Sequence, residues 1–540
     1  MKNSIFFIIF VIVSLLAFLH EPAREFSVLA INDVYRIDAI EDGAIGGFAR
    51  FKTLRDQLTQ EDPDLITLHG GDFLSPSILG QRYNGAQMID IMNQIDGDGE
   101  AFDERFFVVP GNHEFDQTEE YGAILLRNRI DESDFWWVSS NILWSQGSHP
   151  EIIKGIEQIV TSRIIEAGGV KVGIFGLTLE RDQTKYAPID GGYIDIARTM
   201  TKDLRQAGAE VVIGLTHLLI DDDIDILNTL GDNGPDIIFG GHEHTSQFEN
   251  INERYVVVAD SDLVSATIAH FSLQGGNLII ELENKIIDES VAEDTAMQTK
   301  IDAWIARYNS EECGAQVGES CGDVALGHTA VDLVSSEGQN RRYETNTGSW
   351  FADLMRGAFE DDGAQIAFIN SGAIRKNEDI AAGTGLTKTI LQELLPYDPK
   401  LYFIEISGAE LKSILNHAVH KWPGYGYWLQ VSGMAFRHNV EDATAEDIML
   451  IEKDGSLRPI SDNERIRAVT VGYILNTDGP QDGYTMLNKE HIITSHHNEM
   501  KLIDFAQEYL LGLGDTPIAP QIEGRICNPN RPQYCLLDNR

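Results

Sequence analysis

The chain has 540 residues, 43% of them hydrophobic, and a formal net charge of −44. Its length exceeds one ordinary hydrophobic core, so two or more domains are expected. The acidic balance argues against a nucleic-acid groove, which needs clustered Lys and Arg, and it indicates a solvated acidic surface.

The first residues form a short apolar segment. Lys2 precedes an apolar run from Ile5 to Leu19. A run of this length is typical of a secretory signal peptide and is short for a membrane-spanning helix. We expect residues 1–24 to be such a signal, with an uncleaved N-terminal anchor as the alternative. The sequence therefore predicts a secreted, periplasmic or cell-surface protein with no other contact with a membrane.

The next block, residues 25–291, alternates strand-like and helix-like runs. Residues 48–58 have helical periodicity between two strands, and residues 203–207 lead into another strand. This βαβ pattern indicates a layered α/β domain. The pattern leaves the direction of each strand open, and we expect at least some antiparallel strands.

Residues 292–323 are expected to connect two domains. Residues 292–308 are polar and helix-prone, and a Gly- and Cys-containing segment follows. The second domain is predicted over residues 324–526. It begins with a predicted helix at 347–359, capped by Asn346, and continues through short strands with Gly-rich turns.

The four cysteines lie in two local pairs, Cys313 with Cys321 and Cys527 with Cys535. In an exported protein, this spacing favours two small disulfide loops, and four free thiols are the alternative. The second pair would pin the C-terminal tail, residues 527–540.

Five strand-like runs of the first block end in side chains that bind metals. The segments that end these runs are Asn32-Asp33-Val34-Tyr35, Gly70-Gly71-Asp72, Gly111-Asn112-His113-Glu114-Phe115-Asp116, Thr216-His217 and Gly240-Gly241-His242-Glu243-His244. Polar residues at the carboxyl ends of strands lie where an open α/β sheet places its ligands. If the five ends converge, Asp, Asn and His surround one small volume that suits divalent cations. For any single His, a structural, hydrogen-bonded role is the alternative.

Hydrolysis by two metals needs one ligand that bridges cations about 3.5–4 Å apart. Asp72 is the candidate for this bridge. Two glycines precede it, and they let the backbone approach closely.

With these motifs the chain resembles the calcineurin-like metallophosphatases, specifically the exported 5′-nucleotidase family. The resemblance implies an α/β (α+β) protein, in which a four-layer metallophosphatase sandwich is joined by a helical connector to a second α/β domain that binds substrate. It also implies two metal ions that share one ligand. The implied ligands are Asp33, Asp72 and His244 for one ion, and Asp72, Asn112, His217 and His242 for the other.

The resemblance also implies catalytic roles. His113 would lie beside the scissile phosphate as a transition-state stabiliser or general acid, and Asp116 would hydrogen-bond and orient its imidazole. The cofactors would be two divalent cations, Zn²⁺ or Mn²⁺, which convert a water between them to hydroxide. Attack of that hydroxide on phosphorus requires no nucleophile from the protein.

Tyr35 departs from the family pattern, which usually reads Asp-x-His at this point. A neutral phenol is a poor ligand for Zn²⁺ or Mn²⁺, because its ordinary pKa is about 10. Three arrangements are open: a displaced Tyr35 with water in its place, ligation as phenolate, which favours a harder ion such as ferric iron, or one weakly held metal. We favour water in place of a displaced ring.

Six residues of the second block match substrate-binding positions of the family. They are Arg341, Asn370, Arg375, Tyr397, Tyr473 and Asp482. The two tyrosines would sandwich a base, and the others would contact the phosphate, the nucleoside or the ribose hydroxyls. Packing is the alternative for each tyrosine.

The resulting prediction is a hydrolase that releases phosphate from nucleoside 5′-monophosphates. It would act on small nucleotides, not on nucleic acid, as a monomer or homodimer. Among enzymes, the alternative is a 2′,3′-cyclic-nucleotide phosphodiesterase or a nucleotide-sugar pyrophosphohydrolase on the same site. Outside enzymes, the alternative is a nucleotide- or metal-binding surface protein with a degenerate metal site.

Overall fold

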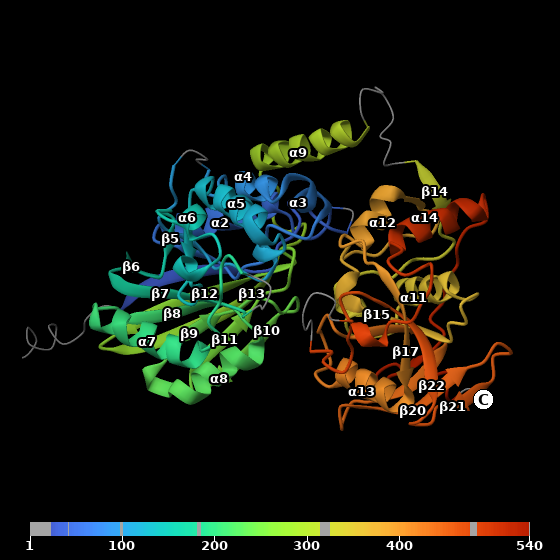
Figure 1. The fold of residues 1–540 in the computed structure, drawn as a ribbon. Helices are drawn as coiled ribbons and strands as arrows, with labels where there is room; N and C mark the ends of the chain where they lie inside the picture. The colour runs from blue at the N-terminus through green and yellow to red at the C-terminus, as the bar shows by residue number, and fades with distance from the viewer. Residues whose placement is uncertain are drawn as a thin grey trace, which may run out of the picture.

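The protein consists of two lobes joined by a long helix. The computed structural model describes residues 23–538, except 42, 98–100, 181–184, 314–323 and 476–482. Figure 1 shows the lobes side by side, with α9 (Thr295–Cys313) lying above them. Almost all of the predicted signal at 1–24 lies outside the described residues, and so does the predicted pairing of Cys313 with Cys321.

The strands described in the first lobe form two sheets. The order of the larger is β13-β12-β1-β2-β3-β4-β5, and the order of the smaller is β10-β11-β9-β8-β7-β6. The strands of the larger sheet are β1 (Arg24–Ile31), β2 (Ile66–His69), β3 (Phe106–Val108), β4 (Trp136–Val138), β5 (Ile159–Val160), β12 (Ser265–Gln274) and β13 (Asn277–Ile286). Those of the smaller are β6 (Ser162–Ala167), β7 (Val170–Thr178), β8 (Val211–His217), β9 (Ile237–Phe239), β10 (Gln247–Ile251) and β11 (Arg254–Val258).

Helices cover the outer face of each sheet. The larger sheet carries α2 (Phe48–Glu61), α3 (Ile78–Tyr83), α4 (Ala86–Met92), α5 (Glu119–Asp131) and α6 (Pro150–Ile153), and the smaller carries α7 (Tyr193–Gln206) and α8 (Ile220–Leu230). Apolar side chains of both sheets, such as Val28 and Ile213, form one shared core between them. The layers are therefore helix, sheet, sheet, helix, and the predicted four-layer α/β sandwich is confirmed.

The middle strands of both sheets are parallel and several edge strands are antiparallel. β1, β2 and β3 run parallel to one another, as do β7, β8 and β9. Antiparallel pairing is found at four strands: β12, β13, β6 and β10. This agrees with the expectation that at least some strands of the lobe are antiparallel. The carboxyl ends of the parallel strands therefore meet at one edge of each sheet.

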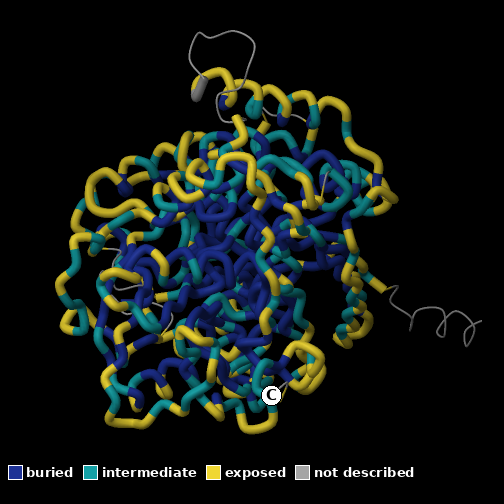
Figure 2. Tube along the Cα trace, turned by 90° about the vertical axis from the view of Figure 1, so that its right-hand side faces the viewer, coloured by how far each residue is buried: buried dark blue, intermediate teal, exposed yellow. Residues whose placement is uncertain are grey.

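The described residues of the second lobe form one core and three small sheets. Their orders are β17-β22-β15-β18, β21-β20-β19-β23 and β14-β16. The strands are β14 (Ala325–His328), β15 (Ile366–Asn370), β16 (Gly385–Thr387), β17 (Leu401–Ser407), β18 (Leu429–Ser432), β19 (Met434–Asn439), β20 (Thr444–Ile451), β21 (Leu457–Pro459), β22 (Arg465–Val471) and β23 (Ile526–Cys527). The helices are α10 (Glu337–Asn340), α11 (Asn346–Ala358), α12 (Lys388–Leu394), α13 (Gly408–Val419) and α14 (Leu502–Leu513). In Figure 2 buried positions fill the middle of the molecule, and exposed positions follow its outer turns and helices.

The predicted cap of α11 is wrong by one residue. Thr345 caps this helix, and its hydroxyl accepts a hydrogen bond from the backbone N–H of Gly348. Asn346 is the first helical residue. Its side chain instead links the loop before the helix, accepting from Val334 N and donating to Asp332 O.

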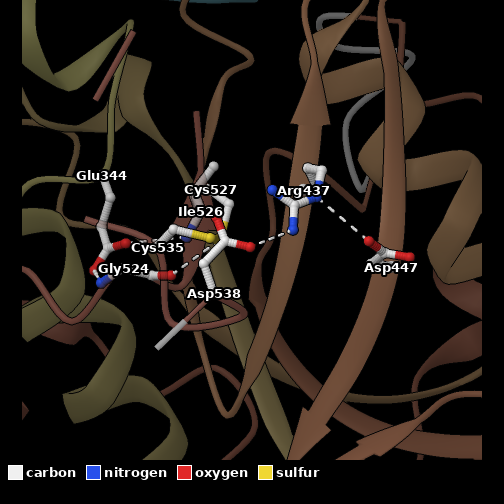
Figure 3. Close-up of a disulfide and its surroundings, with 8 residues drawn as sticks. All are labelled: Glu344, Arg437, Asp447, Gly524, Ile526, Cys527, Cys535 and Asp538. Atoms are coloured by element: carbon white, nitrogen blue, oxygen red, sulfur yellow. Dashed lines mark hydrogen bonds and ion pairs between the residues drawn. A yellow bond between two sulfur atoms is a disulfide. The ribbon is translucent and has the colours of Figure 1, made fainter. Parts of the chain in front are cut away.

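A disulfide between Cys527 and Cys535 holds the C-terminal tail, which confirms that predicted pair. Figure 3 shows the carboxylate of Glu344 beside it. This buried carboxylate accepts backbone N–H groups from Gly524 and Ile526. The covalent loop and the carboxylate together fasten the tail to the second lobe.

Candidate metal centre and active site

The five predicted motifs meet between the ends of parallel strands. Asp33 follows β1, Asp72 follows β2, Asn112 follows β3, His217 ends β8 and His242 follows β9. Hydrogen bonds join these segments: His242 N donates to Asp33 Oδ2 at 2.9 Å, and Asp33 N donates to the carbonyl of Gly71 at 2.9 Å. The two sheets therefore bring side chains distant in sequence to one place.

One group of side chains combines Asp72, Asn112, His217 and His242. Asn112 Oδ1 lies 3.1 Å from His217 Nε2 and 2.9 Å from His242 Nδ1. His217 Nε2 lies 3.3 Å from Asp72 Oδ2. On the far side of its ring, His217 Nδ1 donates to the carbonyl of Gly70 at 2.7 Å, so Nε2 is the nitrogen that faces the group. Carboxylate, amide and imidazole atoms at these separations suit one cation.

A second group combines Asp33, Tyr35, His244 and the same Asp72 oxygen. Tyr35 Oη lies 3.0 Å from His244 Nε2, 3.2 Å from Asp33 Oδ1 and 3.3 Å from Asp72 Oδ2. His244 Nε2 lies 3.4 Å from Asp33 Oδ1. A phenol has one proton and cannot satisfy three acceptors. Each of these separations is that of neighbouring ligands about 2 Å from one cation, so the group is a candidate for a second metal ion.

The favoured expectation was that Tyr35 is displaced and that water takes its place; the ring here occupies another of the three open arrangements, inside the site. The ring is 6% exposed, and its hydroxyl lies among the predicted ligands. The backbone N–H of Tyr35 donates to Asp262 Oδ1 at 3.0 Å, and the guanidinium carbon of Arg375 lies 5.3 Å from the ring centre. These contacts hold the ring inside the site.

The cluster attracts positive charge. Burial opposes protonation of His217, but the Asp72 carboxylate outweighs burial and raises the pKa of His217 to about 10. Burial and the charge of His217 hold the pKa of His242 well below its ordinary value. Burial and the carboxylates of Asp72 and Asp33 raise the pKa of the Tyr35 phenol well above its ordinary value. A cation bound between these groups would supply the missing positive charge.

Strained backbone accompanies the predicted ligands. Asp33, Asp72 and His242 have φ values of 52°, 61° and 77°. Left-handed conformations are uncommon in residues other than glycine and cluster at functional sites. Gly111 packs so closely on Asp72 that a Cβ atom there would collide with Asp72 Oδ1.

Glu114 is a site residue whose role was not predicted, although it lies within the Gly-Asn-His-Glu motif. Its buried carboxylate accepts the backbone N–H groups of Asp72, Phe73 and Leu74 at 2.8–3.0 Å, and that of Gly111 at 2.5 Å. Glu114 therefore ties the loop after β2 to the loop after β3.

His113 and Asp116 form a pair beside this cluster. His113 Nδ1 lies 2.9 Å from Asp116 Oδ2, and His113 Nε2 lies 3.9 Å from Asp72 Oδ2. The backbone N–H of His113 donates to Asp72 Oδ1 at 2.7 Å. From the second lobe, the hydroxyl of Tyr397 lies 3.2 Å from His113 Nε2. The imidazole thus lies at the junction of the two lobes.

Two arginines of the second lobe reach the same place. Arg375 Nη1 lies 3.3 Å from His244 Nε2, and Arg341 Nη2 lies 3.1 Å from His244 Nδ1. Both arginines pair with Glu337, a site residue that no sequence motif indicates. Burial and the nearby Arg341 lower the pKa of His244.

The other predicted substrate residues have fewer recorded contacts with the predicted metal ligands than the two arginines have. Asn370 ends β15, and its buried Oδ1 has no hydrogen-bond partner among the described residues. Tyr397 and Tyr473 are 37% and 41% exposed. They lie at the same end of the pair β17 and β22, where Gly472 N donates to Lys400 O. Asp482 lies outside the described residues.

Two family models together account for most of both lobes. Residues 26–246 match the calcineurin-like phosphoesterases, and residues 325–489 match the 5′-nucleotidase C-terminal domain. The chain belongs to the two-domain 5′-nucleotidase family. A mouse 5′-nucleotidase is similar to this chain: the two are 24% identical in an alignment that covers 93% of this chain and 90% of the mouse protein. A trifunctional nucleotide phosphoesterase of Bacillus subtilis is 23% identical over 88% of this chain, but over 34% of its own length.

Solved structures agree with the fold of the family. A 5′-nucleotidase precursor from Thermus thermophilus is 22% identical, with a TM-score of 0.75 and coverage of 94% of this chain and 99% of its own. A sulfate thiohydrolase from the same species is 16% identical, with a TM-score of 0.68 and coverage of 95% and 98%.

Membership of the 5′-nucleotidase family makes this chain a metal-dependent phosphoester hydrolase. The comparisons favour none of the alternatives: not a binding protein without activity, not a cyclic phosphodiesterase and not a nucleotide-sugar pyrophosphohydrolase. Within the described part of the chain, no helix is both long and apolar enough to cross a membrane.

Proposed function

We propose that this protein releases phosphate from nucleoside 5′-monophosphates, using two divalent cations held by the two side-chain groups. The observation that carries the proposal is the position of Asp72 Oδ2, which lies 3.3 Å from His217 Nε2 and 3.3 Å from Tyr35 Oη. One carboxylate oxygen that faces both groups meets the requirement for a bridging ligand. The names of the relatives support a nucleotide as substrate.

Zn²⁺ and Mn²⁺ are the proposed ions, because the donors combine imidazole with carboxylate and amide oxygen. When bound, two such ions supply Lewis acidity at the phosphoryl group and an acidified water. Asp116 is proposed to orient the ring of His113, so that Nε2 faces a phosphoryl or leaving oxygen as a transition-state stabiliser or general acid. Arg375 would add positive charge from the second lobe.

The base of the nucleotide is proposed to stack on Tyr397 and Tyr473. Both rings are partly exposed and come from one end of a strand pair. The guanidinium carbon of Arg375 lies 5.7 Å from the ring centre of Tyr397, so a base on this ring is close to the proposed phosphate site. Asn370 Oδ1, buried and without a partner among the described residues, is the proposed acceptor from the nucleoside.

Tyr397→Ala is expected to raise KM for AMP by about 5- to 150-fold, which corresponds to the 1–3 kcal/mol of stacking per base. The turnover number should change less, because stacking holds the base equally in the bound substrate and in the transition state. Tyr397→Phe is the matched control: it keeps the ring, loses the hydroxyl near His113, and should keep KM close to that of the unmodified protein. Steady-state kinetics measure both, and an unchanged KM for Tyr397→Ala would remove this ring from the base site.

Tyr35 is proposed to contribute its oxygen as a fourth ligand beside Asp33, Asp72 and His244. Tyr35→His is expected to increase the content of zinc and manganese relative to iron, because imidazole is a better ligand for these ions than a phenol. Tyr35→Phe should lower metal occupancy of the group that contains Tyr35 and leave metal occupancy of the group that contains Asn112 unchanged. Elemental analysis of protein loaded from an equimolar metal mixture tests both. If neither substitution alters metal content or preference, Tyr35 does not tune the site.

A panel of phosphate esters tests the proposed reaction. Purified protein, loaded with Mn²⁺ or Zn²⁺, is assayed on nucleoside monophosphates, 2′,3′-cyclic nucleotides and nucleotide sugars, with phosphate and nucleoside products measured. We expect the highest kcat/KM for 5′-monophosphates and no turnover after chelation. Faster hydrolysis of either alternative class would overturn the assigned substrate while leaving the metal centre in place.

Export is also proposed, since a relative is a snake venom 5′-nucleotidase and residues 1–24 have the composition of a signal. Mass spectrometry of protein expressed in its own host should find a mature N-terminus near residue 24. An intact Met1 would favour the anchor.

A further inference from the structure

The two side-chain groups differ in what holds their histidines. In the group with Asn112, His217 Nδ1 donates to the carbonyl of Gly70, so the first lobe orients this ring by itself. In the group with Tyr35, the outer nitrogen of His244 lies 2.5 Å from Glu337 Oε2, on α10 of the second lobe. Only the second of these two rings takes its orientation from across the lobe junction.

Glu337 is held in this contact by burial and by two arginines. It is 4% exposed, and its carboxylate pairs with Arg341 at 3.1 Å and with Arg375 at 3.7 Å. Because a guanidinium only donates, Glu337 is the acceptor for the N–H of His244 Nδ1. That bond fixes the tautomer in which Nε2 offers its lone pair to the site.

A second chain of hydrogen bonds runs from Glu337 to the same group. The backbone N–H of Glu337 donates to Asn377 Oδ1 at 3.0 Å, and Asn377 Nδ2 donates to Asp262 Oδ2 at 3.1 Å. Asp262 Oδ1 accepts the backbone N–H of Tyr35 at 3.0 Å. The segment around Glu337 therefore supports both the His244 side and the Tyr35 side of one group.

We propose that Glu337 is a positioning residue through which the second lobe completes the metal site formed by Asp33, Tyr35 and His244. The site formed by Asn112, His217 and His242 is complete within the first lobe. Loading of the two sites is therefore unequal, and contact between the lobes governs only one of them. This inference rests on the proposed function, because it takes His244 as a metal ligand.

Calorimetric titration of metal-free protein with Mn²⁺ tests the proposal. The unmodified protein should bind two equivalents. In Glu337→Gln one equivalent should keep its affinity, and the other should weaken by about 10- to 100-fold, the usual cost of losing an outer partner of a metal ligand. Turnover of this variant should recover as Mn²⁺ is raised, which a purely structural defect would not allow. Glu337→Asp, which keeps the charge but shortens the side chain, should weaken the same equivalent and serves if the Gln variant does not fold.

Glu378→Gln is the matched control. Glu378 is also an interlobe carboxylate: it accepts the backbone N–H of Glu41 at 3.0 Å and pairs with Lys376, but contacts none of the predicted ligands. Both equivalents should keep their affinities in this variant. Unchanged affinities in the Glu337 variants, equal weakening of both equivalents, or the same loss in Glu378→Gln would overturn the inference. Fewer than two equivalents in the unmodified protein would instead overturn the proposed function.

Discussion

Asp72→Asn is expected to remove both cations and abolish turnover. Asp72 Oδ2 is the oxygen that faces His217 in one group and Tyr35 in the other. An amide in its place carries no negative charge, so both groups lose the ligand they share. The loss of metal affinity should exceed the about 10- to 100-fold cost of losing an outer partner. Elemental analysis after dialysis, together with kcat for AMP, measures the effect.

Asp64→Asn is the control for this substitution. Asp64 pairs with Arg105 near the surface, at 2.6 Å, and contacts none of the predicted ligands. It should keep its metals and its turnover, because exposed ion pairs contribute little. An Asp72→Asn protein that retained two cations would show that this carboxylate does not bridge them.

His113→Ala is expected to keep both cations and to lose about 10²- to 10⁴-fold in kcat, the usual contribution of a general acid. The imidazole is not in either ligand group, with Nε2 3.9 Å from Asp72 Oδ2. Alanine keeps the backbone N–H that donates to Asp72 Oδ1, so the loop after β3 should hold its place. Steady-state kinetics and elemental analysis on the same sample separate catalysis from metal loading.

Asp116→Asn and His270→Ala complete this experiment. Asp116→Asn should lower kcat by less than His113→Ala, because the imidazole remains but loses its carboxylate partner. His270 lies on β12, where its ring forms a hydrogen bond with the Ser27 hydroxyl, away from the predicted ligands along the sheet. His270→Ala should therefore have a normal kcat. Loss of metals in His113→Ala would contradict its placement beside the ligands, and an unchanged kcat would contradict its role.

The fold of the first lobe could be predicted because hydrophobic strands and their polar ends are close in sequence. Asp72 follows the buried strand β2 by three residues, and His217 is the last residue of β8. Each of these strands has a parallel neighbour in its own sheet, β3 for β2 and β9 for β8. Register then determines where these side chains lie. Helix ends were less predictable: Thr345, not Asn346, caps α11, because two adjacent residues can both cap and tertiary contacts decide between them.

Contacts between the lobes could not be predicted from the sequence. Glu337 lies on a four-residue helix with no repeating pattern, and only its position against His244 reveals its role. Tyr35 was expected to be displaced because a neutral phenol is a weak ligand. The structure instead buries its ring against Arg375, and burial is a property of tertiary packing that a local motif does not contain.

A crystal structure of the protein grown with Mn²⁺, with anomalous scattering recorded at the manganese edge, tests the two-metal site most directly. Two peaks about 3.5–4 Å apart, one on each side of Asp72 Oδ2, are the predicted result. One peak should contact Asn112, His217 and His242, and the other should contact Asp33, Tyr35 and His244. Absence of anomalous density between these side chains, with Asp33, Asp72, Asn112 and His242 turned away from one another, would contradict the account.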